Sequence, residues 1–308
     1  MHRILLIGMV GIVAAGTVST LVQADEIRGL RSVQVDRGIT LHYVEQGAGT
    51  ALILVHGSLS DLSYWRGQIE PMARHYRVIA YSRRYNWPND NPARPNYSAQ
   101  TDAEDLAGLI AALHLGKVYV IGHSYGALAA LFLLTQHPDL LKAAVLAEPP
   151  LIPLLRHLSE PESARGRALY ADIQAHMVTP MRLEFQQRHT EAGTAAFIDY
   201  MFHDPRAWQK LGAGSRDILK DAHEWDVMMN GGTLFPEIPI ASLEATRVPV
   251  LLMSGGKSQL FLDLIAAELA RLLPDSQSVV FQDSGHQMWM QHPLEAREDA
   301  EAFFAKHR

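Results

Sequence analysis

The sequence predicts an α/β fold in which a mostly parallel, twisted sheet carries helices on both faces. Apolar runs typical of fully buried strands alternate with segments of helical periodicity. One of these runs, Val118–Ile121, continues directly into the pentapeptide Gly122–Gly126 and then into an apolar helix. Residues 149–246 hold helical patterns but no strand pattern of the same quality. Such a segment is too long for a loop, so we expect a helical lid over the carboxyl ends of the strands.

The first part of the chain predicts an edge hairpin and then two inner strands. Arg31–Asp36 and Ile39–Gln46 alternate apolar and polar residues around a glycine-containing turn, as hairpin strands do. The continuous apolar runs Ala51–Val55 and Val78–Tyr81 predict buried parallel strands, with a helix over Asp61–His75 between them.

A long loop follows, because Ser82–Tyr97 is rich in proline, asparagine and arginine. We interpret Arg83 and Arg84 as structural, satisfying carbonyl or carboxylate groups near the sheet edge. Ser98 is then expected to cap a helix that runs through Leu113.

The remaining elements are predicted by the same patterns. In the sheet region they are Ala127–Gln136 and Leu141–Ala147, then Val248–Met253, Gln259–Leu273, Ser278–Phe281 and Pro293–Lys306. In the lid, helices are expected over Glu162–Met177, Pro180–His189, Thr194–Phe202 and Ser215–Met229. The chain therefore divides into a core over residues 25–148 and 247–308 and a lid over residues 149–246.

The composition of the chain limits the classes of partner, cofactor and reactive group that it can use. The chain has 308 residues, of which 48% are hydrophobic, enough for one large core with an insertion. A formal charge of −6 gives no reason to expect nucleic acid or an anionic membrane as a partner. Without cysteine there is no disulfide, thiol nucleophile or thiolate metal site. No dinucleotide or phosphate-loop motif and no metal-ligand spacing occurs, so we expect a small-molecule substrate and neither cofactor nor metal. The oligomeric state is left open.

The N-terminus resembles an export signal. A short basic start with Arg3 precedes the apolar run Ile4–Gly16, and Val22-Gln23-Ala24 stands before an acidic pair. We expect residues 1–24 to be removed after Ala24, which leaves an exported, periplasmic or secreted protein without a stable membrane anchor. The alternative is an uncleaved anchor, since Ile4–Val22 is just long enough to span a bilayer.

The pentapeptide Gly122–Gly126 has the G-x-S-x-G pattern between a strand and a helix, which is the layout of a nucleophile elbow. A serine in such a tight turn has strained backbone geometry, and the flanking glycines avoid Cβ clashes. Together with His56-Gly57 after the third strand and Gly285-His286 after the last, this pattern resembles the α/β-hydrolase family over about residues 30–308. The resemblance implies a Ser–His–acid triad and an oxyanion hole.

The resemblance implies Ser124 as nucleophile and His286 as its base. A serine hydroxyl does not ionise by itself, so a neighbouring base must accept its proton during attack on a carbonyl. His286 lies just after the final predicted strand, where a loop can bring the imidazole over the elbow. His123, His56 and His292 are the competing histidines.

The acid departs from the usual family pattern. Ser258 occupies the position after the Val248–Met253 strand at which an aspartate is commonest. The family has a second acid position, at the end of the strand that follows the elbow helix, and Glu148 stands there. We favour Glu148, with Asp263 and Asp283 as alternatives. The oxyanion hole is expected from the backbone N–H groups of Ser58 and Tyr125, each one residue past a motif.

A serine at the elbow excludes the mechanism of epoxide hydrolases and dehalogenases, which use an aspartate there. We therefore expect acyl transfer to water through an acyl-enzyme, with a small to medium carboxylic ester as the leading substrate class. Cleavage of a C–C bond, an amide or a lactone uses the same triad and stays open. A different class is a non-catalytic ligand sensor on a hydrolase scaffold, for which the displaced acid is the only argument.

Overall fold

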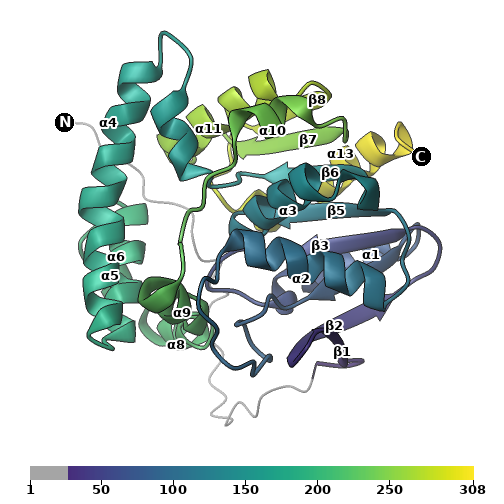
Figure 1. Ribbon diagram of the computed structural model, residues 1–308, viewed down its shortest axis with the longest axis horizontal. Helices are drawn as coiled ribbons and strands as arrows, with labels where there is room; N and C mark the ends of the chain where they lie inside the picture. The colour runs from purple at the N-terminus through teal and green to yellow at the C-terminus, as the bar shows by residue number, and fades with distance from the viewer. Residues whose placement is uncertain (1–26) are drawn as a thin grey trace.

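Among the described residues the sheet has eight strands, and only β2 runs opposite to the others. The computed structural model describes residues 27–308. Its strand order is β1-β2-β4-β3-β5-β6-β7-β8, with β1 and β2 antiparallel to their neighbours (Figure 1). The strands are β1 Arg31–Asp36, β2 Ile39–Gln46, β3 Ala51–Val55, β4 Arg77–Tyr81, β5 Val118–His123, β6 Leu141–Ala147, β7 Val250–Gly255 and β8 Ser276–Phe281. The predicted fold class is confirmed.

Helices cover both faces of this sheet. They are α1 Arg66–Met72, α2 Ala99–Ala112, α3 Tyr125–Gln136, α10 Ile240–Ala245, α11 Leu260–Leu272, α12 Met288–Gln291 and α13 Pro293–Ala305. One face packs on α2, α3 and α11, which share a buried apolar cluster with the strand residues Ile53, Val120 and Leu252. The other face packs on α1 and α13 through residues such as Leu54, Ile121 and Phe304. β3, β5 and β6 are almost wholly apolar because they are buried from both sides.

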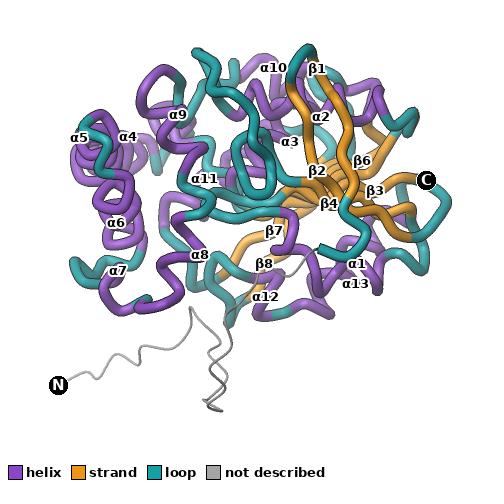
Figure 2. Tube along the Cα trace, turned by 90° about the horizontal axis from the view of Figure 1, so that it is seen from below, coloured by secondary structure: helices purple, strands orange, loops and turns teal. Residues whose placement is uncertain are grey.

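Between β6 and β7 the chain leaves the sheet and forms a helical lid. Its α-helices are α4 Ser163–Ile173, α5 Thr179–Gln186, α6 Thr190–Met201, α7 Ala207–Lys210, α8 Ser215–Leu219 and α9 His223–Gly231. A π-helical turn, Gln174–Val178, joins α4 to α5, and a 3₁₀ segment, Ile152–His157, precedes α4. Figures 1 and 2 show α4, α5, α6, α8 and α9 grouped beside the sheet.

Several elements differ from their predicted form. The helix expected over Asp61–His75 is a 3₁₀ turn, Leu62–Trp65, followed by the short helix α1. The helix expected over Ser215–Met229 is interrupted between α8 and α9, where the Asp221 carboxylate accepts the Trp87 backbone N–H at 2.7 Å. The strand expected from Val248 starts at Val250, since Pro249 has no N–H to donate to a neighbouring strand.

The predicted cleavage after Ala24 lies outside the described residues. Among residues 27–308, no helix combines the length and the apolar composition needed to cross a bilayer.

Candidate active site

Ser124 occupies a strained turn between β5 and α3. Its backbone has φ 53° and ψ −123°, a left-handed conformation that costs about 1–3 kcal/mol for a residue with a side chain. A Cβ on Gly122 would lie 2.6 Å from Ala127 Cα, and a Cβ on Gly126 would lie 2.3 Å from the His56 carbonyl oxygen. The two glycines are therefore required by the close packing of this turn. The Ser124 backbone N–H donates to the Ala147 carbonyl at 2.8 Å, which fixes the turn beside the end of β6.

Glu148 follows β6 directly and is fully buried. The strand ends at Ala147, as predicted, so Glu148 is the first residue after it. The side chain is 0% exposed and uses both carboxylate oxygens. Oε1 accepts the Gly255 backbone N–H at 2.7 Å, and Oε2 pairs with His286 Nδ1. The structure thus brings Glu148 and His286 together at the carboxyl ends of β6, β7 and β8.

This contact sets the orientation and the tautomer of His286. A carboxylate accepts, so Nδ1 carries the proton and Nε2 is left with its lone pair. The His286 carbonyl also accepts the His123 Nε2–H at 2.8 Å, and the two imidazole rings lie 4.6 Å apart. The His286 side chain is 18% exposed, so it is partly accessible to a substrate.

The alternative acids do not contact His286. Asp283 is 86% exposed and lies 3.5 Å from the Lys257 ammonium. Asp263 lies on α11, where burial and the nearby Glu148 carboxylate raise its pKa. Neither carboxyl forms a hydrogen bond with His286 in the described part of the chain.

Two of the competing histidines are buried, neutral structural groups. Burial and the adjacent Arg83 lower the pKa of His56 to about 3. Its Nδ1–H donates to the Gly57 carbonyl at 2.8 Å, and its Nε2 accepts the Arg83 backbone N–H at 2.9 Å. Burial, followed by repulsion from His286, holds the pKa of His123 well below its ordinary value. The third, His292, immediately precedes α13.

The two predicted oxyanion donors flank the serine. A Cβ on Gly57 would lie 3.0 Å from Ser124 Cβ, so the Gly57–Ser58 peptide passes directly beside the nucleophile position. Tyr125 is the first residue of α3. Within residues 27–308, neither the Ser58 N–H nor the Tyr125 N–H donates to a protein acceptor. Both are free to bind a negative oxygen near Ser124.

Ser124 and His286 are not hydrogen-bonded to each other within residues 27–308. Catalytic hydrogen bonds of this kind are commonly long before the substrate binds. The roles of Ser124, His286, Glu148, Ser58 and Tyr125 therefore remain predictions that this geometry supports.

Comparison with known proteins bears on the fold that holds these residues. The sequence profile described as the alpha/beta hydrolase fold matches residues 50–179, which include β3, the elbow and β6. The chain has the α/β-hydrolase fold.

This chain is similar to known proteins over different spans. It is 26% identical to 2-(acetamidomethylene)succinate hydrolase from Mesorhizobium japonicum, over 83% of this chain and 88% of that one. It is 38% identical to an epoxide hydrolase from Caballeronia sordidicola, over 34% of this chain and 33% of that one. The enol-lactonase structure from Burkholderia xenovorans superimposes with a TM-score of 0.69, at 19% identity, over 89% of this chain and all of that one.

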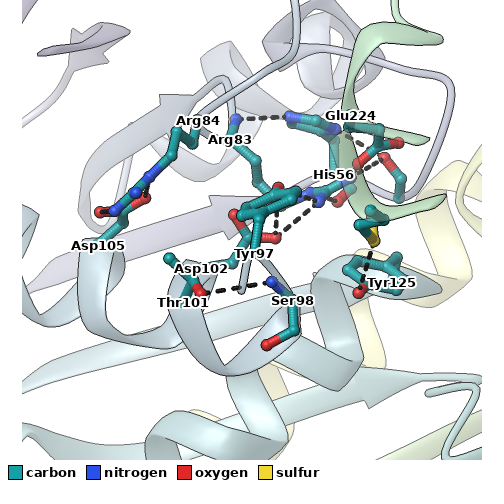
Figure 3. Close-up of polar contacts among 12 residues, drawn as sticks. His56, Arg83, Arg84, Tyr97, Ser98, Thr101, Asp102, Asp105, Tyr125 and Glu224 are labelled. Atoms are coloured by element: carbon teal, nitrogen blue, oxygen red, sulfur yellow. Dashed lines mark hydrogen bonds and ion pairs between the residues drawn. The ribbon is translucent and has the colours of Figure 1, made fainter. Parts of the chain in front are cut away.

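Sequence patterns missed two parts of this site. One is Gly255, whose N–H orients Glu148 and whose Cβ, if present, would lie 2.2 Å from the Gly285 carbonyl oxygen. The paired glycines Gly255-Gly256, standing before the vacant acid position, were the available signal. The other is Arg83. As predicted, its side chain binds carbonyl and carboxylate groups (Figure 3). The strand that it follows, β4, lies inside the sheet and not at the predicted edge.

Proposed function

We propose that this protein is a serine hydrolase that cleaves a small to medium carboxylic ester through an acyl-enzyme. The observation that carries the proposal is the buried Glu148 carboxylate, held by the Gly255 N–H and paired with His286 Nδ1. A fully buried carboxylate is costly unless it is paired and hydrogen-bonded. Its placement beside a histidine and a strained serine turn is the arrangement that acyl transfer requires.

The steps follow from the residues. Ser124 Oγ attacks the carbonyl carbon while His286 Nε2 accepts its proton. Glu148 stabilises the resulting imidazolium without taking its proton. The carbonyl oxygen becomes negative and accepts the N–H groups of Ser58 and Tyr125. His286 then protonates the leaving alcohol, and a water molecule activated by the same imidazole releases the acyl group.

The displaced acid is a geometric equivalent of the usual one. Glu148 reaches Nδ1 from the end of β6, and Gly255 at the end of β7 donates to it from the strand that commonly carries the acid. A charged group therefore faces the imidazole even though Ser258 is neutral. This contact argues against the sensor interpretation, whose only support was the displaced acid.

Amide hydrolysis is the second candidate. The M. japonicum relative matches most of both chains, and its named substrate carries an acetamido group. The same triad cleaves amides when the leaving nitrogen is protonated by the imidazole. The epoxide hydrolase similarity covers a third of the chain, and this protein has serine at the position of the nucleophilic aspartate.

The test uses the protein with p-nitrophenyl acetate and butyrate, an N-acetyl enamine dicarboxylate, and a fluorophosphonate that labels active serines. We expect ester turnover, labelling at Ser124, and loss of both in Ser124→Ala. The exposed Ser278→Ala, on β8 and away from the elbow, serves as the matched control and keeps wild-type turnover.

Glu148→Gln tests the acid in the same assays. An amide has one acceptor oxygen, so it satisfies either Gly255 N–H or His286 Nδ1–H and faces the other with a donor. We expect kcat to fall about 10³–10⁴-fold. Retained turnover in Glu148→Gln would place the acid elsewhere, and Asp263→Asn then identifies or excludes the partly buried candidate on α11. Turnover of the amide but not of the esters would replace the leading substrate class with the second one.

A further inference from the structure

A buried arginine connects the lid to the loop that follows β3. The Arg83 side chain is 0% exposed and all three of its nitrogens donate. Nε donates to the His56 carbonyl at 3.2 Å, and Nη1 donates to Asp102 Oδ2 at 2.8 Å. Nη2 donates to the Gly57 carbonyl at 3.0 Å and to Glu224 Oε2 at 2.5 Å. Burial by itself lowers the pKa of Arg83, but the Glu224 and Asp102 carboxylates outweigh it and raise that pKa well above its ordinary value.

The hydrogen bond to Gly57 has a direct geometric consequence. The Gly57 C=O and the Ser58 N–H belong to one planar trans peptide, so they point in opposite directions. Two donors, Arg83 Nη2 and His56 Nδ1, hold the carbonyl at 3.0 and 2.8 Å. They thereby fix the direction of the Ser58 N–H. A cation on the carbonyl also polarises the peptide and strengthens its N–H as a donor.

Glu224 extends this control to the next peptide. It lies on α9 of the lid, and its side chain is 0% exposed. While Oε2 pairs with Arg83, Oε1 accepts the Leu59 backbone N–H at 2.9 Å. Leu59 has φ 53°, a left-handed conformation that a leucine adopts only when its surroundings hold it there.

The lid also holds the second predicted oxyanion residue. The Tyr125 hydroxyl donates to the Leu234 carbonyl at 2.8 Å, and the Arg83 guanidinium lies 5.0 Å from the centre of the Tyr125 ring. Figure 3 shows Tyr97 and Asp102 on the core side of this network and Glu224 reaching in from the lid. Both predicted donors therefore adjoin contacts made by residues 224–234.

We propose that Arg83 and Glu224 are positioning residues that aim the Ser58 N–H at the developing oxyanion, so that the seated lid completes the oxyanion hole. This inference rests on the proposed function, because only an acyl-transfer reaction develops the charge in question. The lid then helps to stabilise the transition state in addition to covering the site. Donors aimed before the reaction act on the transition state and raise kcat with little effect on KM.

The chain offers a matched pair of substitutions for the test. Glu224→Gln and Asp102→Asn each remove one carboxylate from Arg83 and leave the other in place. In Glu224→Gln the side-chain amide has one acceptor oxygen for two donors, the Leu59 N–H and the Arg83 guanidinium. One of these donors must therefore face the amide NH₂, which is itself a donor. In Asp102→Asn the amide oxygen still accepts from Arg83 and the amide nitrogen can donate to the Tyr97 hydroxyl, so the loop at 57–59 is not touched.

The measurements are kcat and KM for p-nitrophenyl acetate, inhibition by a trifluoromethyl ketone that forms a tetrahedral oxyanion on the serine, and Tm. We expect Glu224→Gln to lower kcat at least about tenfold, with KM within about twofold, and to weaken ketone inhibition by a similar factor. Asp102→Asn should keep kcat within about threefold, whatever happens to its Tm.

Equal kcat losses in the two variants, or a Glu224→Gln enzyme that loses Tm but not kcat, would overturn the inference. If Glu224→Gln does not fold, Glu224→Asp keeps the charge but is one methylene too short to bridge Arg83 and Leu59, and the same loss of kcat is expected. A wild type that neither turns over esters nor reacts with the fluorophosphonate overturns the proposed function itself, and this inference with it.

Discussion

Asp221 is a carboxyl group buried at the turn between α8 and α9. Oδ1 accepts the Trp87 backbone N–H at 2.7 Å, while Oδ2 has no hydrogen-bond partner among residues 27–308. Burial, with repulsion from Asp61 as the next cause, raises its pKa to about 8. The neighbouring Lys220 ammonium is occupied by Asp61 at 2.7 Å, so it does not neutralise Asp221 completely.

This raised pKa makes stability depend on pH in a defined direction. Unfolded aspartate releases its proton near pH 4, whereas folded Asp221 releases it near pH 8. Between these values the folded state binds more protons than the unfolded state, so the free energy of unfolding falls as pH rises. We expect Asp221→Asn to lose less stability than wild type between pH 5 and 9 in urea denaturation. Asp217→Asn, exposed on α8, should follow the wild-type curve; parallel curves for all three proteins would contradict the prediction.

At the scale of elements, the strand-turn-helix unit from β5 to α3 is packed too closely to accept a side chain at either flanking glycine. The atoms that meet a Cβ at Gly122 or Gly126 are backbone atoms of the same unit or of β3 and the residue after it, which cannot rotate away. Backbone shifts of this kind cost about 1–3 kcal/mol in a packed interior, and more when neither side yields. The turn is therefore a rigid joint between sheet and helix.

Gly122→Ala is accordingly expected to lower the free energy of unfolding by at least about 2 kcal/mol. Gly67→Ala is the matched control, because Gly67 lies in α1 and a Cβ there meets nothing within 4 Å. Alanine is the better helix former, so this variant should gain up to about 1 kcal/mol. Chemical denaturation of the two variants beside wild type checks the opposite signs, and a mild effect at Gly122 would show that the turn can relax.

At the scale of the whole molecule, the lid is anchored to the core by polar contacts from the few residues that join α8 to α9 and begin α9. Lys220 reaches Asp61 and lies 4.8 Å from the centre of the Trp87 ring, Asp221 accepts the Trp87 N–H, and Glu224 reaches Arg83 and Leu59. Apolar lid residues such as Met181, Phe185 and Trp225 belong to the same buried cluster as one face of the sheet. Lid and core therefore share one hydrophobic interior.

The expected export of the protein is also a property of the whole chain. Expression of all 308 residues in a host with a secretion pathway should yield a soluble exported form whose first residue is Asp25. Intact-mass measurement of the exported and membrane fractions tests this. A protein that keeps Ile4–Val22 and stays with the membrane fraction would support the uncleaved anchor instead.

Most of the sheet could be predicted because each strand has a local pattern. β1 and β2 have the bounds that their alternating patterns predict, and β3 and β6 have the bounds that their apolar runs predict. The order of the strands has no local pattern, so the sequence does not show that the strand before the arginine loop, β4, lies inside the sheet. The same limit applies to the site. Ser124 and His286 stand in recognisable motifs, whereas Glu224 meets Arg83 across 141 residues of sequence, and no pattern near either residue indicates that contact.

Because the Glu148–Gly255 contact joins the ends of β6 and β7, the return of catalytic activity during refolding shows when these two strands have paired. That contact forms only when β7 has paired with β6 in the observed register, in which Ala144 lies opposite Val250. Because the whole lid separates these strands in the sequence, their pairing requires the closure of a long loop, which slows folding. After dilution from denaturant, helical circular dichroism should therefore return before ester turnover does. The delay between the two signals would time the closure of the sheet around its insertion.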